Sequence, residues 1–372
     1  MGQLLLYGDS VRNANLYYRT GFVIADPILY FEADGRETLV VSGFEKSRAQ
    51  KESRIDDVRS SDELGYTEAF RETGDPTLAD VAVIRNLAGQ SDDAIQVEAT
   101  FPILLADRLR DAGIRLVPNR DLIRRERRTK DEREIKAIAR AQARSEQAIA
   151  HATEILREAI VLEDSVIYRG VPLSSERLKG ELEAALVKDG FLSESTIVAP
   201  GPGSSDPHWT GSGPIRPGQP LILDIFPQDR STRYFGDVTR TFVKGEASPE
   251  LLLMHDTVKV AQQRALDMIR PGVNGRDVFE TVMTTFADAG FGDGGSHNAR
   301  CLHGTGHGVG LEVHELPRIG RVDEELLVGD VVSVEPGLYD PEIGGVRIED
   351  LVVLTEGGHR NLNQLPKELV IP

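Results

Sequence analysis

Cysteine is almost absent from this chain of 372 residues, in which Cys301 is the only one. A single thiol can form neither an intrachain disulfide nor a thiolate zinc site, so a metal would have to be held by oxygen atoms and imidazole. Long apolar runs are also missing, since no stretch approaches the ~20 residues that cross a bilayer. Residues 1–10 lack the basic region and the apolar stretch of a signal peptide. We therefore expect a cytoplasmic protein without a membrane partner.

Positive charge is in short supply. The 43 basic and 60 acidic side chains give a net charge of −17. An acidic surface of this size repels phosphate backbones, so nucleic acid is not an expected partner. The 36 glycines and 19 prolines make up about 15% of the chain, well below the combined share of ~25–30% that is typical of disordered chains. The length suits about two folded domains of roughly 150 residues each.

The N-terminal third alternates short strands and helices. The apolar runs at 28–31 and 38–41 flank Asp34-Gly35, which is a hairpin pattern. A basic run follows at 124–128, and because Glu126 interrupts it we interpret it as a solvated linker rather than an anion-binding patch. We expect an α/β domain over residues 1–125 and a second domain over residues 126–372.

The second domain is predicted to begin with a long amphipathic helix that has Thr129 as N-cap and Glu132 as capping-box partner. Three further helices are predicted, at 175–188, 249–268 and 275–289. Short apolar runs then predict strands at 221–225, 237–242, 331–335 and 346–353. The pattern favours a mainly antiparallel sheet backed by helices, which makes the whole chain α/β (α+β).

Four carboxylates lie within or at the ends of these apolar strands: Asp224, Asp237, Glu335 and Glu349. An ionised carboxylate without a partner is costly to bury. The two-residue period of a strand allows such acids to converge on one side of the sheet. An acid that faces water or pairs with a nearby arginine would explain any one of them, whereas four together indicate a shared cationic partner.

His307 is the best candidate for a nitrogen ligand. It lies in the segment 303–314, where glycines at 304, 306, 308 and 310 indicate a backbone folded tightly enough to aim one imidazole. Four carboxylates and one neutral imidazole balance two divalent cations, which are the equipment of metal-assisted hydrolysis. Such a donor set suits Mn²⁺, Co²⁺ or Zn²⁺, and ligand type alone does not choose among them.

The segments 236–242, 303–314, 334–339 and 345–350 resemble, in order and spacing, the metal-site segments of the pita-bread metallopeptidases. The likeness is to the branch of the Xaa-Pro dipeptidases (prolidases) and aminopeptidase P. Residues 15–22 are similar to the non-catalytic domain of that branch, so the resemblance covers nearly the whole chain. It implies a creatinase-like α/β domain, then a pita-bread catalytic domain with a curved sheet, and a homodimer.

The resemblance also implies roles for individual residues. The four acids and His307 would be metal ligands: Asp224, Asp237, His307, Glu335 and Glu349. Asp237 and Glu349 would bridge both ions. Glu335 would in addition handle the proton of the attacking water. His208 and His314 would lie beside the substrate and stabilise the tetrahedral intermediate or relay a proton. For His208 the alternative is an ordinary loop histidine.

The chain departs from the family's pattern around its first metal aspartate. Phe226 stands where the family usually has glycine, and the interval from Asp224 to Asp237 is longer than the usual one. The hairpin loop at 227–234 is therefore remodelled.

Four residues are our candidates for substrate binding: Arg347, His303, Arg230 and Arg233. Arg347 shares a predicted strand face with Glu349, and a guanidinium can hold a carboxylate bidentately. Arg230 and Arg233 lie in the remodelled loop, where they either are ordinary surface charges or shape the substrate pocket.

The expected reaction is hydrolysis of the peptide bond before proline, by attack of a metal-bound hydroxide on a carbonyl polarised by the second metal. The substrates would be proline-containing dipeptides or short peptides, and we favour a dipeptidase. One alternative is aminopeptidase P, acting on longer peptides. Another is a metal-free pita-bread binding protein, which the presence of all five candidate ligands disfavours, and the same holds for the metal-independent creatinases.

Overall fold

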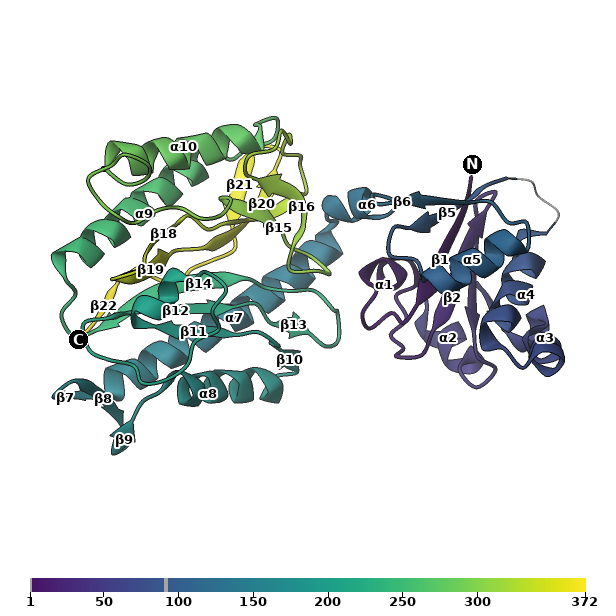
Figure 1. Cartoon of the computed structure of the whole chain (residues 1–372), viewed down its shortest axis with the longest axis horizontal. Coiled ribbons are helices and arrows are strands. Elements are labelled where there is room, and N and C mark those ends of the chain that lie inside the picture. The colour runs from purple at the N-terminus through teal and green to yellow at the C-terminus, as the bar shows by residue number, and fades with distance from the viewer. Residues whose placement is uncertain (1, 90–92) are drawn as a thin grey trace. The chain divides into compact units, whose positions relative to one another are not determined.

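The computed structural model describes residues 2–89 and 93–372. The chain divides into two compact units, Met1–Arg127 and Arg128–Pro372 (Figure 1). The division lies just beyond the boundary that we expected at residue 125. Among the described residues, no helix is both long enough and apolar enough to span a membrane.

Unit 1 is built on a six-stranded sheet in the order β4-β3-β2-β1-β5-β6. Its strands are β1 (Gln3–Gly8), β2 (Ile28–Ala33), β3 (Arg36–Val41), β4 (Asp57–Ser60), β5 (Ile95–Glu98) and β6 (Leu116–Asn119). β2 pairs antiparallel with β1 and β3, while the remaining neighbours pair in parallel. The predicted hairpin is confirmed, and both Asp34 (φ 51°) and Gly35 (φ 74°) adopt the left-handed conformation that such a turn requires.

Helices cover both faces of this sheet. They are α1 (Ala14–Thr20), α2 (Lys46–Glu52), α3 (Tyr66–Thr73), α4 (Pro76–Ala88) and α5 (Ile103–Asp111), with a short 3-10 turn at Asp62–Leu64. Because side chains alternate along a strand, Leu5 packs with Ile84 and Leu109, whereas Leu4 and Leu6 enter the separate core on the other face. The layers are those of an α/β domain.

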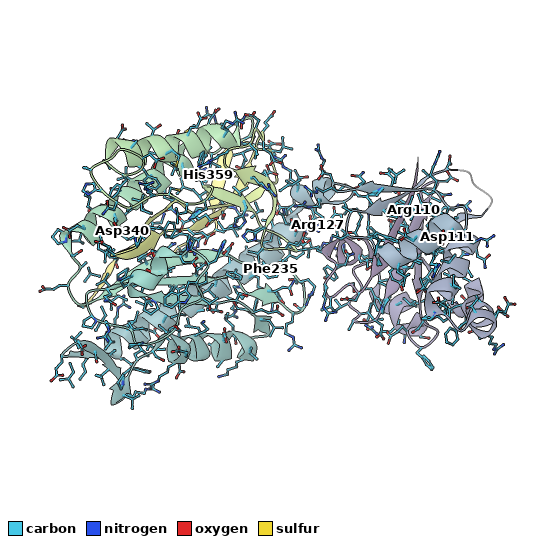
Figure 2. The ribbon with its side chains drawn as sticks, in the orientation of Figure 1. Arg110, Asp111, Arg127, Phe235, Asp340 and His359 are labelled. Atoms are coloured by element: carbon cyan, nitrogen blue, oxygen red, sulfur yellow. The ribbon has the colours of Figure 1, made fainter. Side chains whose placement is uncertain are left out.

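The basic run at the boundary forms helix α6 (Arg124–Arg128), so the prediction of a solvated linker was wrong. Arg127 (Figure 2) is 3% exposed, and its guanidinium donates to the Asn15 side chain at 2.7 Å. Arg128 forms an ion pair with Asp330 at 2.7 Å. Partners far away in sequence satisfy these charges, which the local charge pattern could not reveal.

Unit 2 begins with the 27-residue helix α7 (Glu132–Glu158). Its N-cap is Asp131, which forms a capping box with Glu134, so the predicted cap at Thr129 and Glu132 was wrong. Thr129 instead forms a β-bridge with Asp330, and the helix can begin only after that bridge.

Two sheets, each covered by two helices, make up most of unit 2 (Figure 1). The helices α7 and α8 (Ser175–Lys188) pack on the sheet β11-β12-β14-β22, whose strands are β11 (Ile197–Pro200), β12 (Pro220–Ile225), β14 (Val238–Lys244) and β22 (Val370–Ile371). The helices α9 (Pro249–Met268) and α10 (Gly275–Asp288) pack on the sheet β16-β15-β17-β20-β21, whose strands are β15 (Gly306–Gly308), β16 (Glu315–Ile319), β17 (Val331–Val334), β20 (Asp350–Thr355) and β21 (Gly358–Asn361). Every strand pair except β14–β22 is antiparallel, which confirms the predicted sheet type.

A hairpin of β18 (Gly337–Asp340) and β19 (Gly344–Arg347) lies between these sheets, and β19 packs against β12 and β14. The single strand predicted at 346–353 is therefore two strands, β19 and β20. Ile348 and Glu349 connect them, and the Glu349 backbone N–H donates to Thr239 O at 3.0 Å. This bond holds the chain against β14 and interrupts the strand that was predicted at 346–353.

The remaining strands of unit 2 are short. β7 (Ile160–Leu162), β8 (Ser165–Tyr168) and β9 (Val171–Pro172) form a small sheet, and β10 (Phe191–Leu192) pairs with β13 (Gln228–Asp229). A 3-10 turn spans Gly201–Ser205. β13 lies within the remodelled loop between Asp224 and Asp237.

Candidate metal centre

Each large sheet of unit 2 brings two of the four predicted acids to the same place. Asp224 lies within β12, and Asp237 comes immediately before β14, the neighbour of β12. Glu335 follows β17 directly, and Glu349 directly precedes β20, the neighbour of β17. Asp224, Asp237 and Glu349 are 9%, 3% and 2% exposed. These three acids are buried, whereas Glu335 is partly buried, with 17% of its side chain exposed.

His307 in β15 faces the same cluster. Its Nε2 lies 3.3 Å from Glu335 Oε1 and 3.7 Å from Asp237 Oδ2. Asp237, His307 and Glu349 each place one potential ligand atom within 4.8 Å of the others. A Cβ at Gly306 would come within 1.9 Å of Ser333 O, so β15 can approach β17 this closely only because residue 306 is glycine.

Asp224 has one buried cation as its partner. Arg347 Nη2 lies 2.6 Å from Asp224 Oδ2, and the same guanidinium donates to the hydroxyls of Tyr339 and Thr239 at 2.9 and 3.2 Å. The Thr239 hydroxyl donates in turn to Glu349 Oε2 at 2.8 Å. Arg347, which we expected to face a substrate carboxylate, is thus engaged with the protein's own acid, and its role toward a substrate stays a prediction.

Negative charge exceeds positive charge in this cluster, and the acid pKa values reflect the imbalance. Burial, followed by the charge of Glu349, raises the pKa of Asp237 well above its usual range. Burial also raises the pKa of Glu349, to about 8, with Glu335 and Asp224 adding to the shift. The pKa of Asp224 is raised by burial as well, although Arg347 opposes the shift. The fold therefore holds acids that repel one another.

Glu335 and His307 form the one pair within the cluster that stabilises both charges. Burial favours the neutral carboxyl, but the hydrogen bond and the charge of His307 outweigh it and lower the pKa of Glu335 to about 2. Burial likewise favours neutral His307, but the hydrogen bond and the charge of Glu335 raise its pKa to about 9. In the metal-free protein the acids thus favour the charged form of His307.

These five side chains fit a pair of divalent cations. The donors are carboxylate oxygens and one imidazole, a set suited to divalent metals of intermediate hardness. Asp224 Oδ1 is buried and has no hydrogen-bond partner among the described residues, and an unpaired buried carboxylate oxygen is unfavourable. Two cations would satisfy this oxygen and relieve the repulsion between the acids.

Three further histidines lie around the cluster. His303 Nε2 is 2.6 Å from the Tyr339 hydroxyl, and the His314 ring meets the His307 ring edge to face at 4.3 Å between centroids. Burial is the main cause that lowers the pKa of His303 and of His314, and His208 contributes to both shifts by its charge. His208 is exposed, and these interactions indicate that it lies near the other two.

Tyr339 is a site residue that the sequence analysis did not identify. It is 2% exposed, and its hydroxyl joins His303 to Arg347. Burial raises the pKa of this phenol above its usual range. The available signal was its place in the motif 334–339, four residues after Glu335.

The remodelled loop is anchored on α7. Asp229 forms an ion pair with Arg140 at 2.9 Å, and the Tyr234 hydroxyl donates to Glu134 at 2.5 Å. Next to the loop, the Phe235 backbone N–H donates to Gly310 O at 2.9 Å (Figure 2), which joins it to the glycine-rich segment.

The two arginines of that loop differ in exposure. Arg230 is exposed, while Arg233 is half-buried and has φ 67°. Their contact with substrate stays a prediction.

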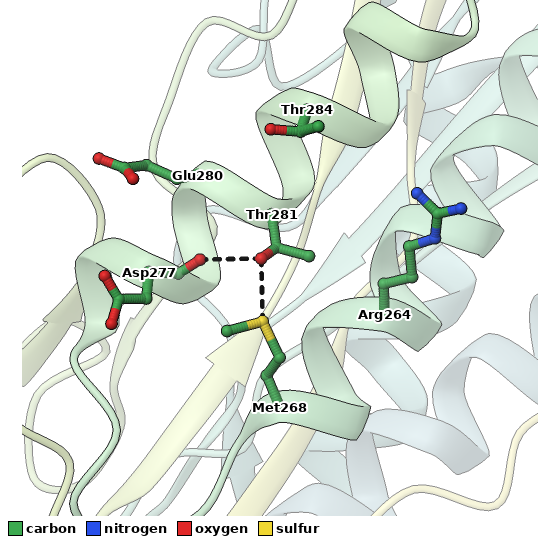
Figure 3. A pocket seen from close by; sticks show the side chains of 6 residues that line it. All are labelled: Arg264, Met268, Asp277, Glu280, Thr281 and Thr284. Carbon is green, nitrogen blue, oxygen red and sulfur yellow. Dashed lines mark hydrogen bonds between the residues drawn. The ribbon is translucent and has the colours of Figure 1, made fainter.

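A separate cavity of about 270 Å³ lies between α9 and α10 (Figure 3). Its lining residues are Arg264, Met268, Asp277, Glu280, Thr281 and Thr284. The Thr281 hydroxyl donates to the Asp277 carbonyl at 3.0 Å and contacts Met268 Sδ at 2.9 Å. Among the described residues, the group of potential metal ligands lies at Asp237, His307 and Glu349 and not in this cavity, so the chemistry is assigned to the cluster around His307.

Comparison with known proteins agrees with this geometry. Residues 136–356 match metallopeptidase family M24. The chain is 30% identical to the uncharacterized peptidase YqhT of Bacillus subtilis over 375 aligned positions, which cover 100% of this chain and 97% of YqhT.

Two solved structures span nearly the whole chain. The prolidase of Pyrococcus horikoshii superposes with a TM-score of 0.79 and 27% identity, covering 99% of this chain and 95% of that one. The X-Pro aminopeptidase of Thermotoga maritima gives a TM-score of 0.80 and 26% identity, covering 100% and 98%. The expected fold is confirmed: the chain belongs to metallopeptidase family M24, in the prolidase branch with the pita-bread fold.

Proposed function

We propose that this chain is a dimetal hydrolase that cleaves the peptide bond before proline, most simply as an Xaa-Pro dipeptidase. The observation that carries the proposal is that Asp237, Glu335 and Glu349 lie beside His307 and interact with Asp224, with too few cations to balance the four acids. Names of relatives agree, since similar proteins are called prolidase and X-Pro aminopeptidase. In this proposal residues 126–372 form the catalytic domain and residues 1–125 a non-catalytic one.

The residues that would hold the metal ions in the proposal are Asp224, Asp237, His307, Glu335 and Glu349. Divalent ions held there would polarise a carbonyl and lower the pKa of water. Manganese is the first choice, with cobalt and zinc as alternatives.

The protein's own groups then have separate tasks. Glu335 accepts the proton of the attacking water, for which an ionised carboxylate at the centre of the site is suited. His314 and His208 stabilise the oxyanion or return the proton to the leaving nitrogen. Tyr339 fixes the ring of His303, which binds substrate, through its 2.6 Å hydrogen bond. The neutral state that burial favours in His303 and His314 leaves each ring able both to donate and to accept.

Substrate length is the finer part of the proposal. A proline nitrogen carries no N–H and its ring is rigid, which a shaped pocket can recognise. Arg347 already binds Asp224, and the proposal keeps Arg347, Arg230 and Arg233 as candidates to meet the terminal carboxylate of a dipeptide. The likeness to an X-Pro aminopeptidase over the full chain keeps aminopeptidase P as the second candidate.

A substrate panel tests the proposal. Protein stripped of metal would receive Mn²⁺, Co²⁺ or Zn²⁺ separately and then be offered Xaa-Pro dipeptides, Xaa-Pro-Xaa tripeptides and matched peptides with alanine in place of proline. We expect the dipeptides to be cleaved fastest and the alanine peptides to be inert. Faster cleavage of tripeptides would replace the dipeptidase by aminopeptidase P, and no cleavage with any cation would refute the hydrolase.

The proposal includes a homodimer that acts in the cytoplasm, as the resemblance implies. Light scattering on the purified protein tests the dimer, for which a mass near twice the chain's 40.8 kDa is expected. A mass of one chain would contradict it.

A further inference from the structure

A buried glutamine of α7 holds the backbone of Asp237. Gln142 is fully buried, its Nε2 donates to Asp237 O at 2.8 Å, and its Oε1 accepts from Asp237 N at 2.7 Å. A Cβ at Gly236 would come within 2.6 Å of the α7 backbone at Ala141 and Gln142. The chain thus lies directly on the helix at this point, and both backbone polar groups of Asp237 are bound by one amide.

A second buried glutamine, on α9, acts on the two glutamates. Gln262 is fully buried, and its Nε2 donates to Val334 O at 3.0 Å and to Ile348 O at 3.1 Å. These carbonyls belong to the residues immediately before Glu335 and Glu349. Both partners are acceptors, so the NH₂ group of the amide must face them.

The fourth acid has no need of such support. Asp224 lies inside β12 and is paired with Ile197 on one side and Thr239 on the other. Asp237, Glu335 and Glu349 all lie just outside the strands, where the backbone N–H groups of Glu335 and Glu349 each donate to one carbonyl, Thr305 O at 2.8 Å and Thr239 O at 3.0 Å. For these three acids, a helix glutamine binds either the backbone of the acid itself or the carbonyl of the residue before it.

We propose that Gln142 and Gln262 are positioning residues of the metal centre, which set the spacing of Asp237, Glu335 and Glu349 before any ion binds. This inference rests on the ligand set in the proposed function. Residues that hold metal ligands from behind commonly change metal affinity about 10–100-fold when they are replaced. A purely structural glutamine would change folding stability instead and leave affinity unchanged.

The test compares Gln142→Met and Gln262→Met with two matched controls. Methionine keeps the length and flexibility of glutamine but can make neither hydrogen bond. Thr153→Val on α7 and Thr257→Val on α9 each remove a buried hydroxyl that bonds only within its own helix, to Ile149 O at 2.9 Å and Leu253 O at 2.7 Å. Should a methionine variant not fold, Gln142→Asn and Gln262→Asn, which keep the amide but shorten its reach, replace it.

Two quantities are measured on metal-free protein: Mn²⁺ affinity by calorimetric titration, and the thermal unfolding midpoint. We expect all variants to unfold at somewhat lower temperature and only the glutamine variants to bind Mn²⁺ about 10-fold or more weakly. Wild-type affinity in the glutamine variants, or an equal loss in the threonine controls, would overturn the inference. Wild-type protein that binds fewer than two ions would instead refute the proposed ligand set.

Discussion

Glu349 and Asp350 are neighbours in the chain and equally buried, yet their surroundings are opposite. Asp350 lies 2.8 Å from Arg240 and 2.6 Å from Lys367, and these cations outweigh burial and lower its pKa. Glu349 faces three other acids, and burial together with their charge raises its pKa to about 8. One peptide bond separates a balanced buried cluster from one with excess negative charge.

This difference separates structure from function in the buried charges of unit 2. A buried acid with its own cations can stabilise the fold only if both partners stay together. A buried acid among other acids destabilises the metal-free fold, and what compensates it must come from outside the chain. The excess charge therefore marks the site, whereas burial alone does not.

The largest expected effect is on catalysis in the cluster with excess negative charge. Glu335→Gln removes both a proton acceptor and one ligand charge, so turnover of an Xaa-Pro dipeptide with Mn²⁺ should fall at least about 10³-fold. Circular dichroism should show an intact fold, because glutamine has the size of glutamate and can still bond to His307. Activity within a few-fold of wild type would exclude Glu335 from the mechanism.

In the balanced cluster, which consists of Asp350, Arg240 and Lys367, removal of the acid should lower the stability of the fold. Asp350→Asn leaves the guanidinium of Arg240, which is 1% exposed, without its carboxylate. Breaking a buried ion pair in this way costs about 3–5 kcal/mol, measured as the free energy of unfolding in urea. A loss below about 1 kcal/mol, near the value for exposed pairs, would show that the cluster is not balanced as described.

At acid pH the folding stability should fall because of a buried histidine, His255, whose pKa is affected by Arg240 of the balanced cluster. Burial, with Lys259 and Arg240 adding and Asp256 opposing, lowers the pKa of His255 to about 4. The unfolded chain then binds more protons than the folded one between about pH 6.5 and 4, so stability falls as pH falls through this range.

The His255→Leu variant should lack this pH-dependent loss of stability, which amounts to about 3 kcal/mol in the free energy of unfolding near pH 4. Wild type and variant are compared by urea unfolding at pH 7.5 and 4.5, both in EDTA so that metal loss does not contribute. Parallel pH profiles for the two proteins would contradict the assignment.

The smallest effect is a gain in stability. Glu349→Gln in metal-free protein at pH 8.5 removes one of the repelling charges, and the free energy of unfolding should rise by at least about 1.4 kcal/mol, the equivalent of one pKa unit. With Mn²⁺ added, wild type should become the more stable of the two. If Glu349→Gln is less stable without metal, the cluster holds no excess of charge.

The sequence was sufficient for most elements of the fold and for the acids. Apolar runs and helical spacing predicted α8 and α9 with their observed ends, and charge within apolar strands predicted the cluster around His307. Local patterns failed where a distant partner decides the structure. Thr129 is drawn into a bridge with Asp330, and Thr239 ends the run that looked like one strand.

The groups that support the site were invisible for a similar reason. Three polar side chains of the site are buried: Gln142, Gln262 and Tyr339. Their burial depends on which face of the helix or strand packs against the rest of unit 2. Sequence periodicity identifies the apolar face but does not indicate which polar residue on it finds a backbone partner. Only the assembled sheets show that Gln142 bonds to Asp237, that Gln262 bonds to the residues before Glu335 and Glu349, and that Tyr339 bonds to Arg347.

The most direct measurement is anomalous diffraction from crystals of the Mn²⁺-loaded protein at the manganese edge. We predict two peaks about 3.5–4 Å apart, the usual separation in two-metal sites, enclosed by Asp224, Asp237, His307, Glu335 and Glu349. Peaks elsewhere on the protein, or a fully loaded crystal with no peak among these five side chains, would contradict the claim that the buried acids form a metal centre.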